Sequence, residues 1–399
     1  MDRLLTTEEA ARRLGVKVPT LYAYVSRGLL ESHRDPARRG SLFDLADIEG
    51  LAARSRGGRQ TATRLATITT AVTQLDLERG PVYRGQRATE LAATASFEDV
   101  AALLWRSDPD EPVDWTAPDL GACPLTQTLD RMRWALVVCG ASDPLRSDLR
   151  PASVARAARR IAAALTEVVG PAPPGEGPRS SIAARLTARL TSNAAVVPTA
   201  LNAALVLLAD HELATSTMAV RVAASVRADP YDALAAGLAT LAGPLHGGAS
   251  QLAYELLAVA ERDGAARALN DVLREQGRLP GFGHSVYKSG DPRFDALYRL
   301  AEPLLSAERR ALVREVVSLA AAHDVPLANV DLALAALSWG TGMPPDAGRT
   351  IFAVARVAGW AAHYREELTE RPVRFRARAV YAASGDGAAQ PAPMTIAEG

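Results

Sequence analysis

Three histidines of this sequence stand beside glycines or acidic residues, which is unusual for histidines of a packed core. They are His211 in DHEL, His246 in LHGG and His284 in GFGHS. A neutral imidazole can donate a hydrogen bond to a carbonyl oxygen, and imidazole titrates close to neutral pH. His246 precedes a helical pattern whose N-terminal dipole disfavours a positive charge, so we expect it to act as a neutral donor.

The loop 281–293, GFGHSVYKSGDPR, places His284 nine residues before Arg293, between two helical patterns. A guanidinium pairs with a carboxylate through two parallel hydrogen bonds. A histidine beside it adds a group that can bind a carbonyl oxygen. The combination predicts a binding site for a small oxo-acid.

Two further charged residues lie among apolar neighbours. Arg356 occurs within FAVARVAG, and a buried cation without a partner is costly, so we expect an anion beside it. Asp331 opens the apolar pattern DLALAALSWG, where an isolated carboxylate is usually a helix cap. From these residues alone, capping and catalysis are both open for Asp331.

Composition narrows the class of protein. The 399 residues include 45 basic and 45 acidic side chains, so the net charge favours neither nucleic acid nor a membrane as partner. Cys123 and Cys139 lack the CxxC spacing of a zinc site, and two cysteines do not make a disulfide framework. The first residues lack the apolar core of a signal peptide, and no apolar run approaches the ~20 residues that cross a bilayer. We expect a cytoplasmic protein without a membrane segment.

The arrangement of apolar residues predicts an all-α fold. Helical periodicity recurs from residue 118 to 242 and again further on, while strand alternation persists nowhere. Glycine and polar residues interrupt the pattern after residue 56, and the C-terminal residues are small, polar and proline-bearing. We predict an N-terminal domain at 1–56, a linker at 57–66, a helical domain at 67–383 and a disordered tail at 384–399.

The N-terminal segment has the signals of two short helices joined by a turn. Thr6 and Glu9 form a capping-box pattern, Gly15 ends the first helix, and Pro19 suits the first turn of a second one. With Ser41-Leu42-Phe43 as a wing, the segment resembles winged helix-turn-helix domains of the MerR and excisionase type. If it binds DNA, the residues expected to face the groove and phosphates are Lys17, Thr20, Tyr22, Tyr24 and Arg27. A docking or dimer-contact module of the same shape is the alternative.

A set of segments between about Ile68 and Tyr381 resembles the citrate synthase family, in the family's order. They are GPLHGGA, GFGH with VYK and DPR, NVD, FAVARVAGWAAH and RARAVY. The resemblance implies a large helical domain with a smaller inserted helical domain at about 249–345. It also implies a homodimer that closes over its substrates. The helix-turn-helix domain is an addition to the usual family plan.

The resemblance also implies an activity, that of an acyltransferase of the tricarboxylic acid cycle. Acetyl-CoA would condense with oxaloacetate, and the citryl-CoA product would be hydrolysed, with no metal or other cofactor. Asp331 would be the base, His246 would bind the thioester oxygen, and His284 would activate the ketone. The residues implied to bind oxaloacetate are His211, Arg293, Arg356 and Arg376, the last from the partner subunit. Those implied to bind CoA are Lys288 and Phe352.

Three departures from the family pattern leave other functions open. Ala214, Ser250 and the run 332–334 replace residues that flank the site in the family. The first alternative is a 2-methylcitrate synthase, which uses propionyl-CoA with the same residues; the small side chains at 332–334 could leave room for the longer acyl group. The second is a DNA-binding regulator whose synthase-like domain senses CoA esters or oxo-acids.

Overall fold

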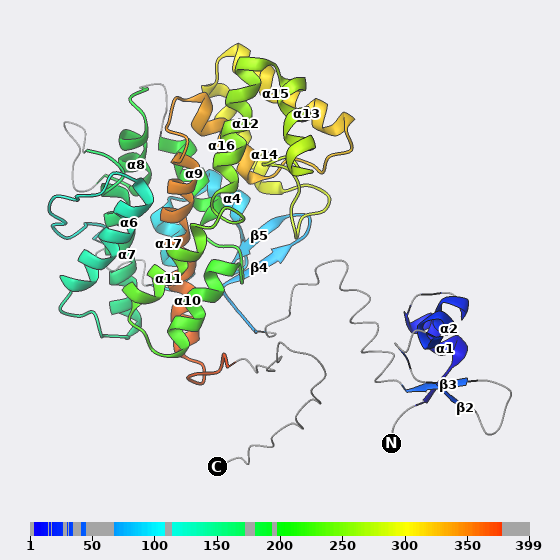
Figure 1. The fold of residues 1–399 in the computed structure, drawn as a ribbon. Helices are drawn as coiled ribbons and strands as arrows, with labels where there is room; N and C mark the ends of the chain where they lie inside the picture. Colours follow the sequence, from blue (N-terminus) through cyan, green and yellow to red (C-terminus); the bar gives the residue numbers. More distant parts are fainter. Residues whose placement is uncertain are drawn as a thin grey trace. The chain divides into compact units, whose positions relative to one another are not determined.

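The structure is a computed structural model in which two compact units are distinguished, Met1–Ile68 and Thr69–Gly399 (Figure 1). It describes residues 4–14, 16, 18–26, 30, 32–34, 41–44, 68–107, 114–171, 180–193 and 198–376. Each unit has its own hydrophobic core. The linker predicted at 57–66 and the tail predicted at 384–399 lie outside the described residues.

The smaller unit combines two helices with a three-stranded antiparallel sheet. Its elements are β1 (Leu4–Thr6), α1 (Thr7–Leu14), α2 (Val18–Ser26), β2 (His33–Arg34) and β3 (Ser41–Asp44). The sheet order is β1-β3-β2, and Phe43 of the central strand is fully buried beside Leu5 and Leu21. These elements agree with the predicted helix-turn-helix and wing. Strand β1 was not predicted, because three residues are too few to show alternation.

The predicted capping box at the start of α1 is confirmed. The Thr6 amide donates to Glu9 Oε2 at 2.9 Å, and the Glu9 amide donates to Thr6 Oγ1 at 3.4 Å. These two bonds satisfy backbone donors that the first turn of a helix leaves without partners.

The residues predicted to face DNA do not all lie on an exposed face of α2. Thr20 and Tyr22 are exposed, Tyr22 to 45%. Tyr24 is half-buried and packs against the small core. Lys17 and Arg27 lie outside the described residues. DNA contacts therefore stay a prediction for all five residues.

A small antiparallel sheet at the start of the larger unit was not predicted. It consists of β4 (Thr73–Asp76), β5 (Gly80–Tyr83) and β6 (Gln86–Arg87), in that order. Strands of two to four residues are too short to show alternation in a sequence. The hydroxyl of the fully buried Tyr83 donates to Val206 O at 3.0 Å, which ties the sheet to the helix that ends at Leu208.

Helices form nearly all the rest of the larger unit, which confirms the predicted all-α class. The first group is α4 (Ala88–Thr94), α5 (Phe97–Trp105), α6 (Thr128–Ala141), α7 (Pro151–Glu167), α8 (Ile182–Leu190), α9 (Pro198–Leu208), α10 (Thr215–Ser225) and α11 (Pro230–Leu241). The second is α12 (Ala249–Asp263), α13 (Ala265–Gln276), α14 (Pro292–Ala301), the 3-10 helix η2 (Glu302–Leu304), α15 (Ala307–Ala322), α16 (Val330–Gly340) and α17 (Ala347–Leu368).

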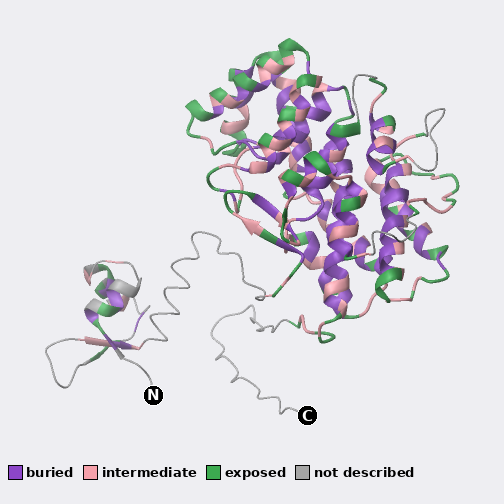
Figure 2. Cartoon of the chain, turned by 180° about the vertical axis from the view of Figure 1, so that it is seen from behind, coloured by how far each residue is buried: buried purple, intermediate pink, exposed green. Residues whose placement is uncertain are grey.

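Helix α17 passes through the centre of the larger unit. It packs against α5, α7, α9, α10 and α11 of the first group and against α12 and α16 of the second. Every residue from 353 to 364 of α17 is buried, and Figure 2 shows that buried residues, in purple, fill the interior of the larger unit. Because both groups of helices contact α17, side chains from its middle can meet residues from either group.

Helices α12 to α16 gather at one end of the larger unit (Figure 1). Within this group, α12 and α14 pack on α16, and α13 packs on α15. The group covers Ala249–Gly340. The smaller subdomain expected at about 249–345 falls on these helices, and its boundaries stay a prediction.

Candidate active site

A cavity of about 570 Å³ lies where both groups of helices meet the middle of α17. Seven of the nine residues predicted for catalysis and substrate binding line it: His211, His246, His284, Arg293, Asp331, Phe352 and Arg356. Lys288 and Arg376 do not. A larger cavity of about 850 Å³, beside β4 and α5, contains none of the nine.

Two loops that flank the cavity are joined by backbone hydrogen bonds. The Gly283 amide donates to Leu327 O at 2.8 Å, and the Asn329 amide donates to Gly281 O at 2.9 Å. The Asn329 side chain adds a bond from Nδ2 to Gly283 O at 2.6 Å. This bridge brings His284, which follows the first loop, to the same cavity as Asp331, which follows the second.

Glycine is required at position 281 because the loop lies directly on α16. Gly281 has φ 81°, and a Cβ there would lie 2.9 Å from the Leu332 Cβ. Leu332 is fully buried beneath the loop and does not line the cavity, nor do Ala333 and Leu334. These three side chains are therefore not part of the cavity wall, and the choice of acyl group stays a prediction.

The hydrogen bonds of His284 place its proton on Nε2. Its Nδ1 accepts from the amides of Val286 at 3.0 Å and Tyr287 at 3.3 Å, so a neutral ring carries its hydrogen on Nε2. Arg293 Nη2 lies 3.4 Å from that nitrogen; since both are then donors, this contact is not a hydrogen bond. Burial, followed by the charge of Arg293, lowers the pKa of His284 to about 4. The ring is thus a neutral donor.

Asp331 does not cap its helix, so the catalytic interpretation is favoured over the capping one. The N-cap of α16 is Asn329, whose Oδ1 accepts from the Asp331 amide at 2.9 Å. Among the described residues, the Asp331 carboxylate has no hydrogen-bond partner. Burial raises its pKa to about 6, and the charge of Arg293 opposes this rise. A carboxylate with this pKa, at the wall of a cavity, is suited to act as a general base.

Arg293 is held by Asp291, for which no role was predicted. Arg293 Nε donates to Asp291 Oδ1 and Nη2 donates to Oδ2, each at 2.9 Å, and both residues are buried. Burial would lower the pKa of Arg293, but the Asp291 carboxylate raises it. The guanidinium is therefore fixed along one edge, which leaves Nη1 for a ligand.

Arg356 is a buried cation that forms no ion pair with the described carboxylates. Its Nε donates to Leu208 O at 2.9 Å, and its guanidinium lies 4.5 Å from the centre of the Phe352 ring. Nη1 is buried without a hydrogen-bond partner in the described part of the chain. Burial lowers the pKa of Arg356 to about 10. The charge of the buried Asp210 carboxylate acts on Arg356 and opposes this lowering of its pKa. Nη1 still lacks a hydrogen-bond partner, and a ligand anion at the cavity would supply one.

His246 is held by Ser216, whose role was also not predicted. Trp360 Nε1 donates to Ser216 Oγ at 3.3 Å, and Ser216 Oγ lies 2.8 Å from His246 Nε2. Since the buried hydroxyl needs an acceptor, we assign its hydrogen to His246 Nε2, which puts the ring proton on Nδ1. Burial, followed by the charge of Arg356, lowers the pKa of His246 to about 4. His246 is thus a neutral donor as predicted, and its low pKa comes from burial and the charge of Arg356.

His211 lies against the same loop as His284. Its Nε2 is 3.1 Å from the hydroxyl of the buried Tyr287, and its ring meets that of His284 edge-on at 5.2 Å. Burial, followed by the charge of Arg293, lowers the pKa of His211 well below its usual value. Three neutral imidazoles thus face one cavity.

Two residues predicted to bind substrate lie away from the cavity. Lys288 is exposed, and its Nζ donates to His284 O at 3.0 Å. Arg376 is exposed at the end of the described residues. A CoA contact for Lys288 and a place for Arg376 in a partner's site stay predictions.

Four residues of the site were missed in the sequence: Ser216, Tyr287, Asp291 and Asn329. Asp291 and Asn329 carried a readable signal, because each stands at the position of a helix N-cap, and Asp291 precedes a proline. Ser216 has no such signal, since its contact with His246 joins two separate segments.

The described residues also bear on three other features: a metal site, a membrane-spanning helix and a reactive thiol. They contain no group of three or more His, Cys, Asp or Glu that could hold a metal ion. No described helix is long and apolar enough to cross a membrane. Both cysteines are free thiols, and burial raises the pKa of Cys139 to about 12, far from the value of a reactive thiol.

The fold and the site define a class of protein: a helical protein whose cavity combines neutral imidazoles, a carboxyl group with a raised pKa and buried guanidiniums. Residues 61–378 match the family model described as citrate synthase, C-terminal domain, and residues 4–56 match that of a helix-turn-helix domain. Since the first match covers most of the chain, the chain belongs to the citrate synthase family.

Relatives with this family name cover about half of the sequence. The chain is 36% identical to citrate synthase of Saccharolobus solfataricus over 194 residues, 46% of this chain and 51% of that protein. It is 37% identical to citrate synthase of Corynebacterium glutamicum over 183 residues, 42% of each. The chain spans about half the length of the curated relatives it matches.

Two solved structures are similar over most of the chain. Citrate synthase from Thermotoga maritima has a TM-score of 0.66 at 22% identity, covering 84% of this chain and 98% of that one. Citrate synthase from Thermoplasma acidophilum, in a ternary complex with carboxymethyl coenzyme A and oxaloacetate, has a TM-score of 0.68 at 24% identity, with the same coverage. At these identities the likeness shows the fold.

Proposed function

We propose that this protein condenses acetyl-CoA with oxaloacetate and hydrolyses the resulting citryl-CoA to citrate and CoA. The observation that carries the proposal is Asp331, a carboxylate with pKa about 6 and no described hydrogen-bond partner, in one cavity with two neutral histidines. The shared family and the relatives named citrate synthase support the same reaction.

In the proposed condensation, Asp331 takes a proton from the methyl carbon of acetyl-CoA. The Nδ1 proton of His246 forms a hydrogen bond to the thioester oxygen, where negative charge develops. The methyl carbon then bonds to the ketone carbon of oxaloacetate, while the Nε2 hydrogen of His284 binds the ketone oxygen as negative charge develops there. That oxygen takes up one proton and Asp331 releases the proton it accepted, so both side chains return to their starting states. Water finally cleaves the thioester C–S bond and releases the CoA thiol. Only protons and electron pairs move, so we propose no metal or redox cofactor.

The two carboxylates of oxaloacetate would pair with the buried guanidiniums of Arg293 and Arg356. Arg356 Nη1 lacks a described partner, and Arg293 is fixed with Nη1 free, so each can pair with one substrate oxygen. We propose His211 as a further contact. Phe352, which meets the His246 ring edge-on at 5.6 Å, would border the thioester, and Lys288 would lie near a CoA phosphate.

We propose a homodimer in which Arg376 completes the site of the partner subunit. Arg376 is exposed and absent from the cavity of its own chain, which supports a role elsewhere. A monomer would then lack one oxaloacetate ligand. Size-exclusion chromatography coupled to light scattering would measure the assembly state.

A thiol-release assay tests the activity. With oxaloacetate and acetyl-CoA, the folded protein should release free CoA. Asp331→Asn should bind both substrates yet lose about a thousandfold in kcat, because it removes the base and little volume. Absence of turnover by the wild-type protein would refute the enzyme proposal; unchanged kcat in the variant would refute the assignment of the base.

The choice between acetyl-CoA and propionyl-CoA is made by the same assay. The sequence feature that suggested room for propionyl-CoA, the run 332–334, is buried away from the cavity. An extra methylene changes binding in a pocket by only ~1–3 kcal/mol. We therefore propose acetyl-CoA as the better substrate, and a larger kcat/KM with propionyl-CoA would reverse this choice.

DNA binding by the smaller unit is a second proposal. The helix-turn-helix match over 4–56 and the exposed Thr20 and Tyr22 on α2 support it. The full-length protein should bind duplex DNA with an affinity that falls as salt rises, because phosphate contacts release counterions. An affinity independent of salt would contradict it. A regulator without turnover is excluded if the thiol-release assay is positive.

A further inference from the structure

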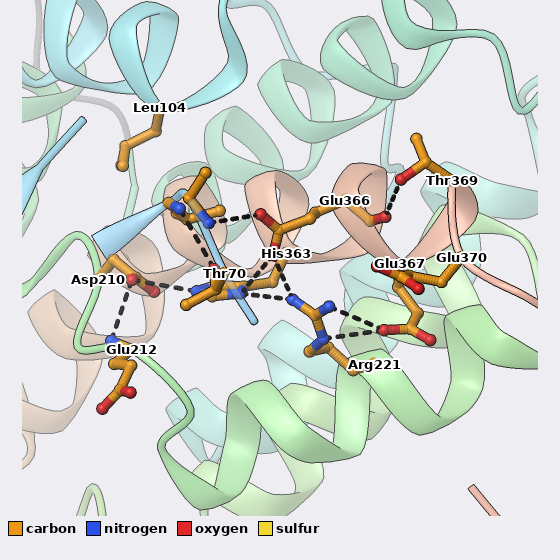
Figure 3. A network of polar contacts seen from close by, with 12 residues as sticks. Thr70, Leu104, Asp210, Glu212, Arg221, His363, Glu366, Glu367, Thr369 and Glu370 are labelled. Carbon is orange, nitrogen blue, oxygen red and sulfur yellow. Dashed lines mark hydrogen bonds and ion pairs between the residues drawn. The ribbon is translucent and has the colours of Figure 1, made fainter. Parts of the chain in front are cut away.

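A series of buried polar side chains leads from the residue before His211 to the end of the described chain. Asp210, His363, Arg221 and Glu367 have no exposed surface, and Figure 3 shows them between three segments of the fold. Together with Arg374, we name these residues the buried polar network. None of them takes part in the proposed condensation.

The cavity end of the network is the pair formed by Asp210 and His363. Asp210 Oδ2 lies 3.2 Å from His363 Nε2, and His363 Nδ1 lies 3.0 Å from Arg221 Nη1. A guanidinium can only donate, so Nδ1 accepts and the Nε2 hydrogen points to the carboxylate. The His363 ring therefore links the Asp210 carboxylate to the Arg221 guanidinium.

Close packing fixes this end against α17. The Gly359 amide donates to Ala209 O at 3.0 Å, and a Cβ at position 359 would lie 2.5 Å from the same oxygen and collide with the Asp210 carboxylate. The turn 209–210 cannot move away without breaking these contacts. His211, which lines the cavity, is the next residue.

The other end is formed by Arg221 and two glutamates of α17. Arg221 Nη1 donates to Glu366 Oε2 at 2.7 Å, and its Nε donates to Glu367 Oε2 at 2.9 Å. Glu367 also accepts from Arg374 Nε at 2.7 Å and from Arg374 Nη2 at 2.6 Å. One buried carboxylate thus holds two guanidiniums, and one of them belongs to the segment that follows α17.

The segment after α17 has a conformation that needs such support. Val373 has φ 57°, a region that β-branched residues rarely adopt. Its amide donates to Ser225 O at 2.9 Å, and the Arg374 guanidinium lies 4.8 Å from the centre of the Phe375 ring. These contacts hold the chain in a defined place immediately before Arg376.

We propose that the buried polar network positions two oxaloacetate ligands, His211 at one end and Arg376 at the other. The inference rests on the proposed function, in which both residues bind oxaloacetate. Apolar side chains could fill the same space without the cost of burying charges. The presence of charged side chains instead indicates that the buried polar network orients the residues at its two ends. Because Arg376 is proposed to serve the partner's site, the network would connect two sites of a dimer.

Arg374 is the residue at which the proposal is best tested. Its side chain is 23% exposed, and without it the buried Glu367 still keeps its bond to Arg221. Arg374→Ala should raise the KM for oxaloacetate about tenfold and leave kcat and the KM for acetyl-CoA within about twofold, by analogy with other residues that orient ligand-binding groups. Arg374→Lys keeps a cation beside Glu367 and should recover part of the loss. Arg371→Ala, exposed in the same segment, is the control and should behave as wild type.

A double-mutant cycle on the affinity for oxaloacetate, measured by calorimetry, tests whether Arg374 positions Arg376 or only stabilises the fold. If Arg374 acts through Arg376, Arg374→Ala should have no further effect in an Arg376→Ala background. Independent, additive losses would overturn the proposal. So would a lower melting temperature of Arg374→Ala with unchanged affinity, which would show a role in stability alone.

The same measurements distinguish failure of this inference from failure of the proposed function. A wild-type protein that binds oxaloacetate and turns over, with Arg374→Ala indistinguishable from it, refutes the positioning role and leaves the function intact. A wild-type protein that does not bind oxaloacetate refutes both.

Discussion

The two oxygens of the Asp291 carboxylate accept hydrogen bonds from Nε and Nη2 of Arg293, each 2.9 Å long. Asp291 Oδ2 also accepts from the Val330 amide at 3.0 Å, at the start of the helix that carries Asp331. Next to burial and the opposing charge of Arg293, the charge of Asp291 contributes to the raised pKa of Asp331. One side chain thus acts on both the substrate-binding cation and the base.

Asp291→Asn should weaken oxaloacetate binding about 10- to 100-fold, because asparagine offers one acceptor oxygen where Arg293 uses two. Titration calorimetry measures the change. Asp295→Asn, at an exposed position on the same helix, is the control and should bind normally. An equal loss of acetyl-CoA affinity would contradict a specific effect on Arg293.

The rate of the reaction should increase with pH through about 6. Asp331 must be ionised to accept a proton, and its pKa of about 6 sets the acidic limb of the profile. His246 and His284, each with a pKa of about 4, remain neutral over the same interval and do not add to that limb. A kcat profile recorded from ~pH 5 to ~pH 8 checks this, and a flat profile would exclude Asp331 as the base.

Asp291→Asn supplies a second check on the same profile. Removing the negative charge beside Asp331 should lower its pKa, so the acidic limb should move to lower pH. A limb that stays in place in this variant would show that Asp291 does not influence Asp331 electrostatically.

Arg356→Met should lose oxaloacetate binding at least ~100-fold while keeping the stability of the larger unit. Methionine fills the space over Phe352 and removes a buried cation that has no described carboxylate partner. In calorimetry, oxaloacetate should raise the melting temperature of the wild type and not that of the variant. A variant that melts far below the wild type would mean that the bond from Arg356 to Leu208 O is structural.

Gly359→Ala should destabilise the larger unit by about 1–3 kcal/mol, because the added Cβ meets backbone that cannot give way. The contact is with Ala209 O, which lies within 2.5 Å of the Cβ position. Gly243→Ala, whose Cβ would find only an ordinary contact at 3.4 Å, is the matched control. Equal melting temperatures of the two variants would contradict the close packing of the turn on α17.

Much of the site could be predicted because its residues stand in unusual neighbourhoods. His246 and His284 lie beside glycines, and Arg356 lies among apolar residues, so each had a physical reason to be noticed. Arg356 was predicted to need an anion; the charge of the buried Asp210 acts on it, while its Nη1 has no hydrogen-bond partner among the described residues. For Asp331, the deciding signal was also present, since Asn329 already fills the capping position.

The parts that could not be predicted are contacts between distant segments and very short strands. Ser216 and His246 are joined by tertiary packing, as are Asp210 and His363, and no pattern in the neighbouring sequence predicts either contact. The strands β4 to β6 are too short for alternation to appear. The partial burial of Tyr24 had no local signal either, because the small core it packs against forms only when β1, α2 and β3 meet.

Among the described residues, the two hydrophobic cores share no residue, and this bears on how the chain unfolds on heating. The smaller core has six buried apolar residues among those described, whereas the larger one collects both groups of helices around α17. Because each unit has its own core, we expect heat to produce two transitions, with the small unit contributing little enthalpy. If both transitions are seen, no single free energy of unfolding describes this chain.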